Sequence, residues 1–183
     1  MNKKIITLTG FMGCGKTYVS KILAREIGYG IIDSDAEIER RAGKSIPQIM
    51  AEEGEAGFRL AERRALEDIL SGEFFVLSAG GGAILKNADL LMSRTTVVFL
   101  DTDFDKCYGR IKNDRNRPLA SGKSRDEIFR LYRERYEIYR TNCHFSVKHE
   151  DAAITVKKIK EFLQNNLQAR FFCIKVVAQG EIN

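Results

Sequence analysis

Apolar residues follow two patterns along this chain: short continuous runs, and repeats at the spacing of a helix. Short runs rich in β-branched and aromatic residues predict buried strands and fall at residues 5–8, 29–33, 74–77, 96–100 and 145–147. Between them, apolar residues recur at helical spacing, at residues 19–27, 35–43, 45 onward, 55–70, 85–92, 104–111, 128–139 and 154–163. Strands that are apolar throughout and alternate with helices are typical of a parallel sheet covered on both faces. The pattern predicts an α/β fold: a doubly wound, three-layer α/β/α arrangement around a central parallel β-sheet.

Glycine, proline and short polar residues mark the ends of these elements. Gly28 and Gly43 predict helix stops, and Pro47 fits the first turn of a helix. Ser34 or Asp35 is expected to cap the helix that follows the second strand.

The first strand leads into a glycine-rich stretch. Gly10, Gly15, Lys16 and Thr17 have the spacing G-x-x-x-x-G-K-[ST] of the phosphate-binding P-loop. Glycines let the backbone approach a phosphate closely, and the loop's N–H groups can then cradle its oxygens. Lys16 can reach the β- and γ-phosphates, and the Thr17 hydroxyl can ligate Mg²⁺. The alternative, a glycine-rich turn that binds nothing, lacks a reason for this strand–loop–helix context, so we expect a P-loop NTPase fold.

Composition limits the class of protein and its setting. A hydrophobic fraction of 44% with 30% charged residues is ordinary for a soluble protein, and no apolar run is as long as a membrane span. The net charge of +5 suits anionic ligands, but it is dispersed, so neither nucleic acid nor a membrane is expected as a partner. The N-terminal apolar run is short for a signal peptide, and the four cysteines have no C-x-x-C spacing, which favours a cytoplasmic location.

The length of 183 residues favours a single domain covering residues 1–183. Residues 168–183 follow the last expected core helix and have the composition of a strand. We interpret them as a C-terminal extension on the surface. The histidines, His144 and His149, are expected at the surface too.

The order of motifs resembles that of the shikimate kinase family. A GTPase would carry D-x-x-G and N-K-x-D, and neither occurs in the chain. The landmarks of the resemblance cover residues 4–163 in order: Gly10–Thr17, Asp33-Ser34-Asp35, Phe58-Arg59 with Glu62, Gly80-Gly81-Gly82, Arg117-Pro118-Leu119, and Arg135 four residues before Tyr139. The resemblance implies a kinase that transfers the γ-phosphoryl group of Mg-ATP to the 3-hydroxyl of shikimate, with ATP and Mg²⁺ as cofactors and a monomeric state.

On the nucleotide side, the resemblance implies a set of ATP-binding residues: Gly13, Cys14, Gly15, Lys16, Thr17, Tyr18, Arg110 and Arg117. Lys16 is also implied to be catalytic, and Arg110 to pack on adenine. Asp33 and Thr17 would position Mg²⁺, in part through water. Without the resemblance, Asp33 and Asp35 would read equally well as a turn and a helix cap. The stretch at residues 147–151 does not match the family's adenine contacts.

On the acceptor side, the resemblance implies that Asp35 binds the acceptor hydroxyls and is a candidate general base. Arg59 and Arg135 would clamp the shikimate carboxylate, since a guanidinium can donate two parallel hydrogen bonds to it. Gly81 and Gly82 would face the substrate. The alternatives are solvated helical arginines and a flexible strand-to-helix turn.

Residues 112–126 form a basic loop that corresponds to the family's lid. The catalytic Arg117 would close onto the nucleotide phosphates and stabilise developing charge, while the closed loop excludes water. The alternative is a solvated basic loop.

Two other functions remain open at this point. A kinase for another small acceptor, such as gluconate, would share the P-loop. A nucleotide-binding regulatory module without turnover would not need Lys16, Asp33, Asp35 and Arg117 together.

Overall fold

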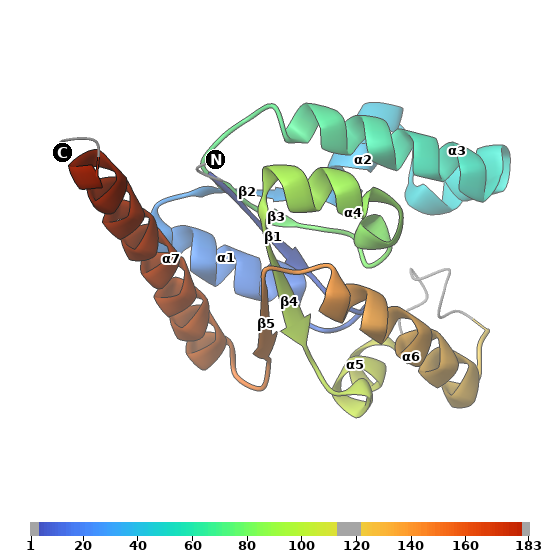
Figure 1. The fold of residues 1–183 in the computed structure, drawn as a ribbon. Helices are drawn as coiled ribbons and strands as arrows, with labels where there is room; N and C mark the ends of the chain where they lie inside the picture. Colours follow the sequence, from blue (N-terminus) through green and yellow to red (C-terminus); the bar gives the residue numbers. More distant parts are fainter. Residues whose placement is uncertain (1–3, 113–121, 181–183) are drawn as a thin grey trace.

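The computed structural model describes residues 4–112 and 122–180, with side chains described as far as residue 166. Within them, one sheet contains five parallel strands in the order β2-β3-β1-β4-β5 (Figure 1). The strands are β1 (Ile5–Thr9), β2 (Gly30–Asp33), β3 (Phe75–Ser78), β4 (Thr96–Asp101) and β5 (Phe145–Lys148). Their register pairs Thr7 of β1 with Leu77 of β3 and Val97 of β4. The carboxyl ends of β1, β2 and β3 therefore meet at one edge of the sheet.

Helices cover both faces of this sheet. They are α1 (Lys16–Ile27), α2 (Ser34–Ala42), α3 (Ile46–Ile69), α4 (Ala83–Arg94), α5 (Phe104–Ile111), α6 (Arg125–Thr141) and α7 (Ala152–Gly180). α1 and α7 pack together on one face, and α4 covers the other with α3 and α6 beside it (Figure 1). α2 packs against α3 next to the edge strand β2. The expected three-layer α/β/α fold is confirmed.

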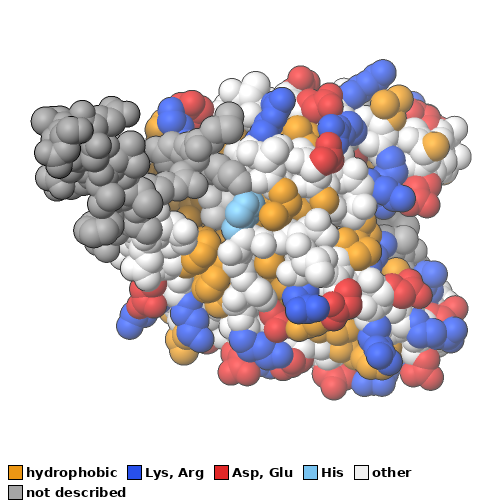
Figure 2. Space-filling model, in the orientation of Figure 1, with side chains coloured by type: hydrophobic (Ala, Val, Ile, Leu, Met, Phe, Trp, Pro, Cys, Tyr) orange, Lys and Arg blue, Asp and Glu red, His pale blue; other side chains and the backbone are white. Residues whose placement is uncertain are grey.

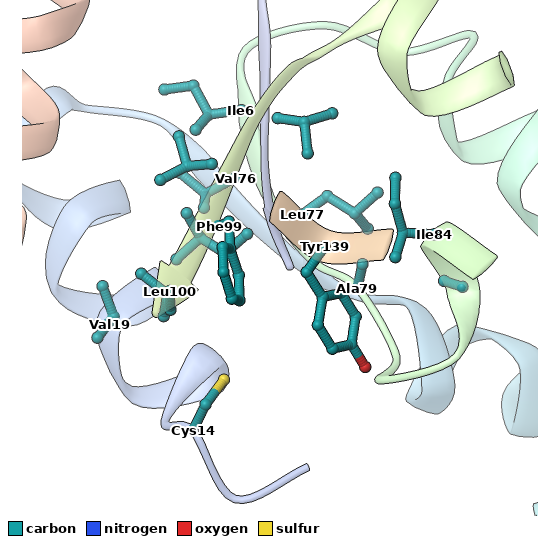
Figure 3. Packing of buried hydrophobic residues seen from close by; sticks show 14 of the residues in the cluster. Ile6, Cys14, Val19, Val76, Leu77, Ala79, Ile84, Phe99, Leu100 and Tyr139 are labelled. Carbon is teal, nitrogen blue, oxygen red and sulfur yellow. The ribbon is translucent and has the colours of Figure 1, made fainter. Parts of the chain in front are cut away.

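The central strands are the core of the molecule. Leu8, Val76, Leu77, Val98 and Leu100 are fully buried, as the unbroken apolar runs predict for strands covered on both faces. Figure 3 shows this packing, with the ring of Tyr139 from α6 among the buried side chains. Burying each of these side chains contributes about 1.5–3 kcal/mol. This rigid sheet supports the loops at its carboxyl edge.

One local expectation needs correction, and one is refined. The cap of α2 is Asp33, not Ser34 or Asp35: its Oδ1 accepts hydrogen bonds from the N–H groups of Asp35 at 3.1 Å and Ala36 at 3.4 Å. Asp33 ends β2 in extended conformation, so its side chain can reach the first free N–H groups of the helix. Gly54, with φ 69° and ψ −174°, breaks α3 between the two predicted helical stretches.

The C-terminal segment is helical up to Gly180, although its composition favours a strand. Strand propensity depends on a neighbouring strand to pair with, whereas a helix satisfies its own backbone hydrogen bonds. The continuous α7 is the result.

The surface carries charges of both signs. On the face shown in Figure 2, Lys and Arg side chains are interspersed with Asp and Glu. Among the described residues, none of the helices combines the length and hydropathy needed to cross a membrane.

Candidate active site

The P-loop, residues 10–17, connects β1 to α1. Gly10, Gly13 and Gly15 have positive φ angles of 146°, 78° and 100°, a region that favours glycine. Gly15 is the N-cap of α1, and no described side chain caps this helix start. The free N–H groups of α1 and the positive end of its dipole therefore face whatever binds in the loop, and both favour a phosphate.

Lys16 lies over the P-loop. Its Nζ donates hydrogen bonds to the carbonyl oxygens of Gly10 at 2.9 Å and Phe11 at 3.2 Å. Cys14, 3.7 Å from the same Nζ, is buried. Cys14 packs as a small core residue and is not exposed to oxidants.

Oxygen atoms from three elements gather beside Lys16. Thr17 Oγ1 donates to Asp33 Oδ2 at 3.2 Å and lies 3.3 Å from Ser78 Oγ. Asp33 thus uses one carboxylate oxygen as a helix cap and directs the other toward Thr17. Hydroxyl and carboxylate oxygens are the protein ligands that Mg²⁺ prefers, and it keeps several waters besides. The donor set fits Mg²⁺. Ser78 was missed at the sequence level; its signal is a hydroxyl at the end of an apolar strand, just before three glycines.

Arg110 and His149 flank the other side of the P-loop. Arg110 Nη1 donates to the Gly13 carbonyl at 2.9 Å. His149 is buried, contrary to expectation, and its Nε2 lies 3.1 Å from where a Cβ on Gly15 would be. Burial lowers the pKa of His149, and the cation of Arg110 adds to this effect. The imidazole is therefore neutral at neutral pH.

Thr155 of α7 contacts His149 from the side opposite the P-loop. Its Oγ1 lies 2.8 Å from His149 Nδ1 and 2.5 Å from the carbonyl oxygen of Asp151. The other ring nitrogen of His149, Nε2, faces the P-loop at Gly15.

The glycine segment, residues 80–82, receives one contact from each of three helices. The Asp35 carboxylate of α2 lies where a side chain on Gly80 would have to be. Tyr139 of α6 donates its hydroxyl proton to the Gly81 carbonyl at 2.5 Å. Arg59 of α3 lies against Gly82, with Nη1 2.8 Å from the position of a Cβ. The three neighbouring glycines thereby bring Asp35, Arg59 and the end of α6 to one place.

The two arginines of the acceptor side differ in their surroundings. Arg59 Nη1 donates to the buried Glu62 at 3.0 Å, and Nη2 lies 3.4 Å from the exposed Glu55. Arg135 is 8% exposed and contacts Tyr139. Burial raises the pKa of Tyr139, so its hydroxyl remains a donor although the cation of Arg135 acts in the other direction. Arg140 on the same helix is exposed, so Arg135 is the arginine of the pair that points inward.

A cleft of about 330 Å³ runs along the carboxyl edge of the sheet. The predicted site residues that line it are Gly13, Gly15, Lys16, Thr17, Tyr18, Asp33, Asp35, Gly81 and Arg110. Cys14, Arg59, Gly82 and Arg135 do not line it: Cys14 is buried within the P-loop, Arg59 lies against Gly82, and Arg135 is buried beside Tyr139. Arg117 and most of the expected lid fall outside the described residues. The cleft joins a phosphate-binding loop to the Asp35 carboxylate, and Arg59 lies next to it against Gly82. This arrangement is suited to phosphoryl transfer onto an anionic acceptor.

Comparisons with known proteins find similar chains. The family model described as shikimate kinase matches residues 12–165. A shikimate kinase of Nitrosomonas europaea is 41% identical over 167 residues, covering 88% of this chain and 79% of the relative. One of Methylococcus capsulatus is 42% identical over 149 residues, covering 80% of this chain and 83% of the relative.

Solved structures agree with the sequence relatives. The shikimate kinase of Acinetobacter baumannii in complex with shikimate is 36% identical, with a TM-score of 0.85, covering 90% of this chain and 95% of that one. A gluconokinase from Sinorhizobium meliloti has a TM-score of 0.57 at 15% identity, covering 93% of this chain and 97% of that one. That second likeness shows the fold alone.

Proposed function

The chain belongs to the shikimate kinase family and transfers the γ-phosphoryl group of ATP to the 3-hydroxyl of shikimate, and we propose that the cleft at the carboxyl ends of β1, β2 and β3 performs this transfer on Mg-ATP. The products are shikimate 3-phosphate and ADP. The observation that carries the assignment of the cleft is the convergence of Asp35, Arg59 and Tyr139 on the glycine segment beside the P-loop.

The nucleotide side of the cleft holds the phosphates. The N–H groups of the P-loop bind the β-phosphate, and Lys16 exchanges the carbonyls of Gly10 and Phe11 for the β- and γ-phosphate oxygens. Arg110, held by the Gly13 carbonyl, packs on the adenine, and Tyr18 borders the same region. Lys16 supplies positive charge where negative charge develops during transfer.

Thr17 and Asp33 hold Mg²⁺, and Ser78 is placed to assist them. When bound, the ion would neutralise negative charge on the nucleotide phosphates. The 3.2 Å hydrogen bond between Thr17 and Asp33 keeps the two oxygens close to each other and beside Lys16.

The acceptor side holds shikimate. Arg59 and Arg135 bind its carboxylate, and Gly81 and Gly82 face the ring because a side chain there would fill the space. Asp35 binds the hydroxyls and accepts the proton of the 3-hydroxyl as this oxygen attacks. Phosphoryl transfer through a loose transition state depends only weakly on a general base. Asp35 therefore contributes to catalysis mainly by orienting the 3-hydroxyl of shikimate.

Arg117 completes the site from the basic loop at residues 112–126. Its guanidinium stabilises the charge that develops on the transferred group, and closure of the loop excludes water as a competing acceptor. Arg117→Ala is expected to lower turnover more than it weakens shikimate binding, which kcat and the shikimate Kd of the variant measure. Equal loss in both quantities would contradict this role.

One assay tests the function as a whole. ADP release, followed by a coupled assay, is measured with shikimate, with gluconate and without acceptor. We expect release to depend on shikimate. ADP release that depends on gluconate would identify a gluconate kinase. The absence of turnover with both shikimate and gluconate would favour a nucleotide-binding regulatory module.

A single chain supplies every described group of this site, from α1, α2, α3, α5, α6 and the strand ends. We therefore expect activity from a monomer, which size measurements of the active protein test.

A further inference from the structure

Behind the acceptor side of the cleft, two buried polar side chains of α3 and α4 contact each other. Glu62 is 1% exposed and Asn87 is 2% exposed. Asn87 Nδ2 donates a hydrogen bond to Glu62 Oε2 at 3.3 Å. Burying a carboxylate or an amide costs free energy unless the group is hydrogen-bonded. The bond between Asn87 and Glu62 offsets part of this cost for both side chains.

Asn87 lies at a break in α4. Its φ of −128° and ψ of 27° are not helical. Its Nδ2 also donates to the carbonyl of Ala83 at 3.0 Å, the acceptor that a regular helix gives to the backbone N–H four residues later. Both N–H protons of the Asn87 amide therefore form hydrogen bonds. One bonds the Ala83 carbonyl oxygen at the break in α4, and the other bonds Glu62. A leucine at this buried position would supply neither donor.

Glu62 receives two donors on the same oxygen. Arg59 Nη1 donates to Oε2 at 3.0 Å and Asn87 Nδ2 at 3.3 Å. Burial raises the pKa of Glu62, while the charge of Arg59 and the hydrogen bonds from Arg59 and Asn87 lower it. Asn87 thus favours the charged carboxylate that Arg59 needs as a partner.

Glu62 in turn is the buried anchor of Arg59. The side chain of Arg59 is 18% exposed, that of Glu62 2%, and that of its other partner, Glu55, 67%. An exposed ion pair fixes a side chain weakly, whereas a buried charge-assisted hydrogen bond defines its direction. Glu62 therefore determines how the guanidinium lies against Gly82.

We infer that Asn87 is a positioning residue for the acceptor: it holds the Glu62 carboxylate in the orientation that fixes Arg59 against Gly82. The inference rests on the proposed function, in which Arg59 binds the shikimate carboxylate. Asn87 does not touch the substrate and acts through Glu62.

The first test replaces Asn87 by a residue of similar size without donors. Asn87→Leu should raise the KM for shikimate by about tenfold, the scale of one hydrogen bond to a charged group. The KM for ATP and kcat should stay close to those of the wild type. Asn166→Leu is the matched control, because the exposed Asn166 makes the same side-chain bond to a carbonyl four residues earlier, at 2.9 Å, without contacting a carboxylate.

A second variant keeps the shape and changes the charge. In Asn87→Asp two carboxyls face each other and share a proton at low pH. As the pH rises this proton is lost, the two anions repel, and Arg59 loses its fixed partner. The ratio of the shikimate KM of Asn87→Asp to that of the wild type should therefore increase with pH, a result that loss of packing alone would not produce.

A double-mutant cycle with Glu62→Gln shows whether the effect passes through Glu62. In that background Asn87→Leu should no longer change the shikimate KM. An unchanged shikimate KM in both Asn87 variants would overturn the inference, as would equal increases in both KM values or additive effects in the cycle. Lack of shikimate turnover in the wild type would instead refute the proposed function, so the two failures can be told apart.

Discussion

At the residue scale, the nucleotide side depends on charge more than on packing. Lys16 is half-buried and bonded to two backbone carbonyls of its own loop. It adds little to the apolar core, so its replacement should affect chemistry and spare the fold.

Lys16→Ala should reduce kcat by about 10²–10³-fold, as expected when a group that stabilises transition-state charge is removed. Its thermal unfolding should resemble that of the wild type. The matched control is Lys21→Ala on the exposed face of the same helix. Steady-state kinetics and calorimetry measure both properties, and full activity in Lys16→Ala would overturn the mechanism.

Two arginines of α6 provide a matched pair for acceptor binding. Arg135→Ala should weaken shikimate binding by about 2–4 kcal/mol, the cost of losing one partner of a charge pair in a closed site. ATP binding should change little. Arg140 is exposed and paired with Glu137 at 2.7 Å, so Arg140→Ala should leave both affinities unchanged. Calorimetric titration with shikimate and with ATP measures both affinities of each variant. Loss of shikimate affinity in Arg140→Ala but not in Arg135→Ala would assign carboxylate binding to Arg140, about one helical turn further along α6.

At the element scale, the glycine segment determines how closely three helices approach the cleft. A methyl group on Gly80 would occupy the place of the Asp35 carboxylate. Because α2 is short and capped by Asp33, a shift of Asp35 also disturbs the oxygen that faces Thr17.

Gly80→Ala should therefore lower kcat/KM for shikimate by about 10²-fold, since small displacements of positioning groups have effects of this size. Gly109 of α5 is the control, because nothing lies within 4 Å of a Cβ built there. Gly109→Ala should keep full activity and gain about 0.5–1 kcal/mol of stability, since alanine loses less backbone entropy in a helix. Kinetics and denaturant titrations test both, and equal activity in the two variants would show that Asp35 tolerates the displacement.

Elements and motifs differed in how well the sequence predicted them. The strands, most helices and the P-loop follow from local signals, because periodicity and glycine spacing act over a few residues. The helical course of residues 168–180 did not, since strand propensity says nothing about whether a partner strand is available. His149, Ser78 and Asn87 were missed for a related reason: each depends on a contact with a distant segment. Asp33 was predicted to position Mg²⁺, while the helix cap was assigned to Ser34 or Asp35 although Asp33 fills that position.

At the scale of the whole molecule, stability and the site are linked through His149. This residue joins the loop after β5 to the P-loop and to α7. The charged groups around it are Arg110, Asp151 and Lys106, and burial and Arg110 dominate in lowering its pKa below the ordinary 6.5.

The lowered pKa of His149 makes the stability of the fold depend on pH. Below pH 6.5 the unfolded chain binds a proton at His149 that the folded protein does not bind, so the free energy of unfolding falls as the pH drops from 6.5 toward the lower pKa of the folded state. His149→Asn should remove this part of the slope. Denaturant titrations between pH 5 and pH 8 measure the slopes (roughly the range in which histidine titrates), and identical slopes in wild type and His149→Asn would contradict the assignment.

The meeting of three helices at the glycine segment also affects how the molecule moves. Asp35, Arg59 and Arg135 are far apart in the chain, and a molecule that binds all three acts as a non-covalent cross-link between α2, α3 and α6. None of these helices can then open without first releasing the acceptor. At a concentration one hundred times its Kd, such a ligand raises the free energy of unfolding by about 2.7 kcal/mol. An acceptor bound as proposed would therefore connect α2, α3 and α6 during each catalytic cycle, and this connection would be lost when the product leaves.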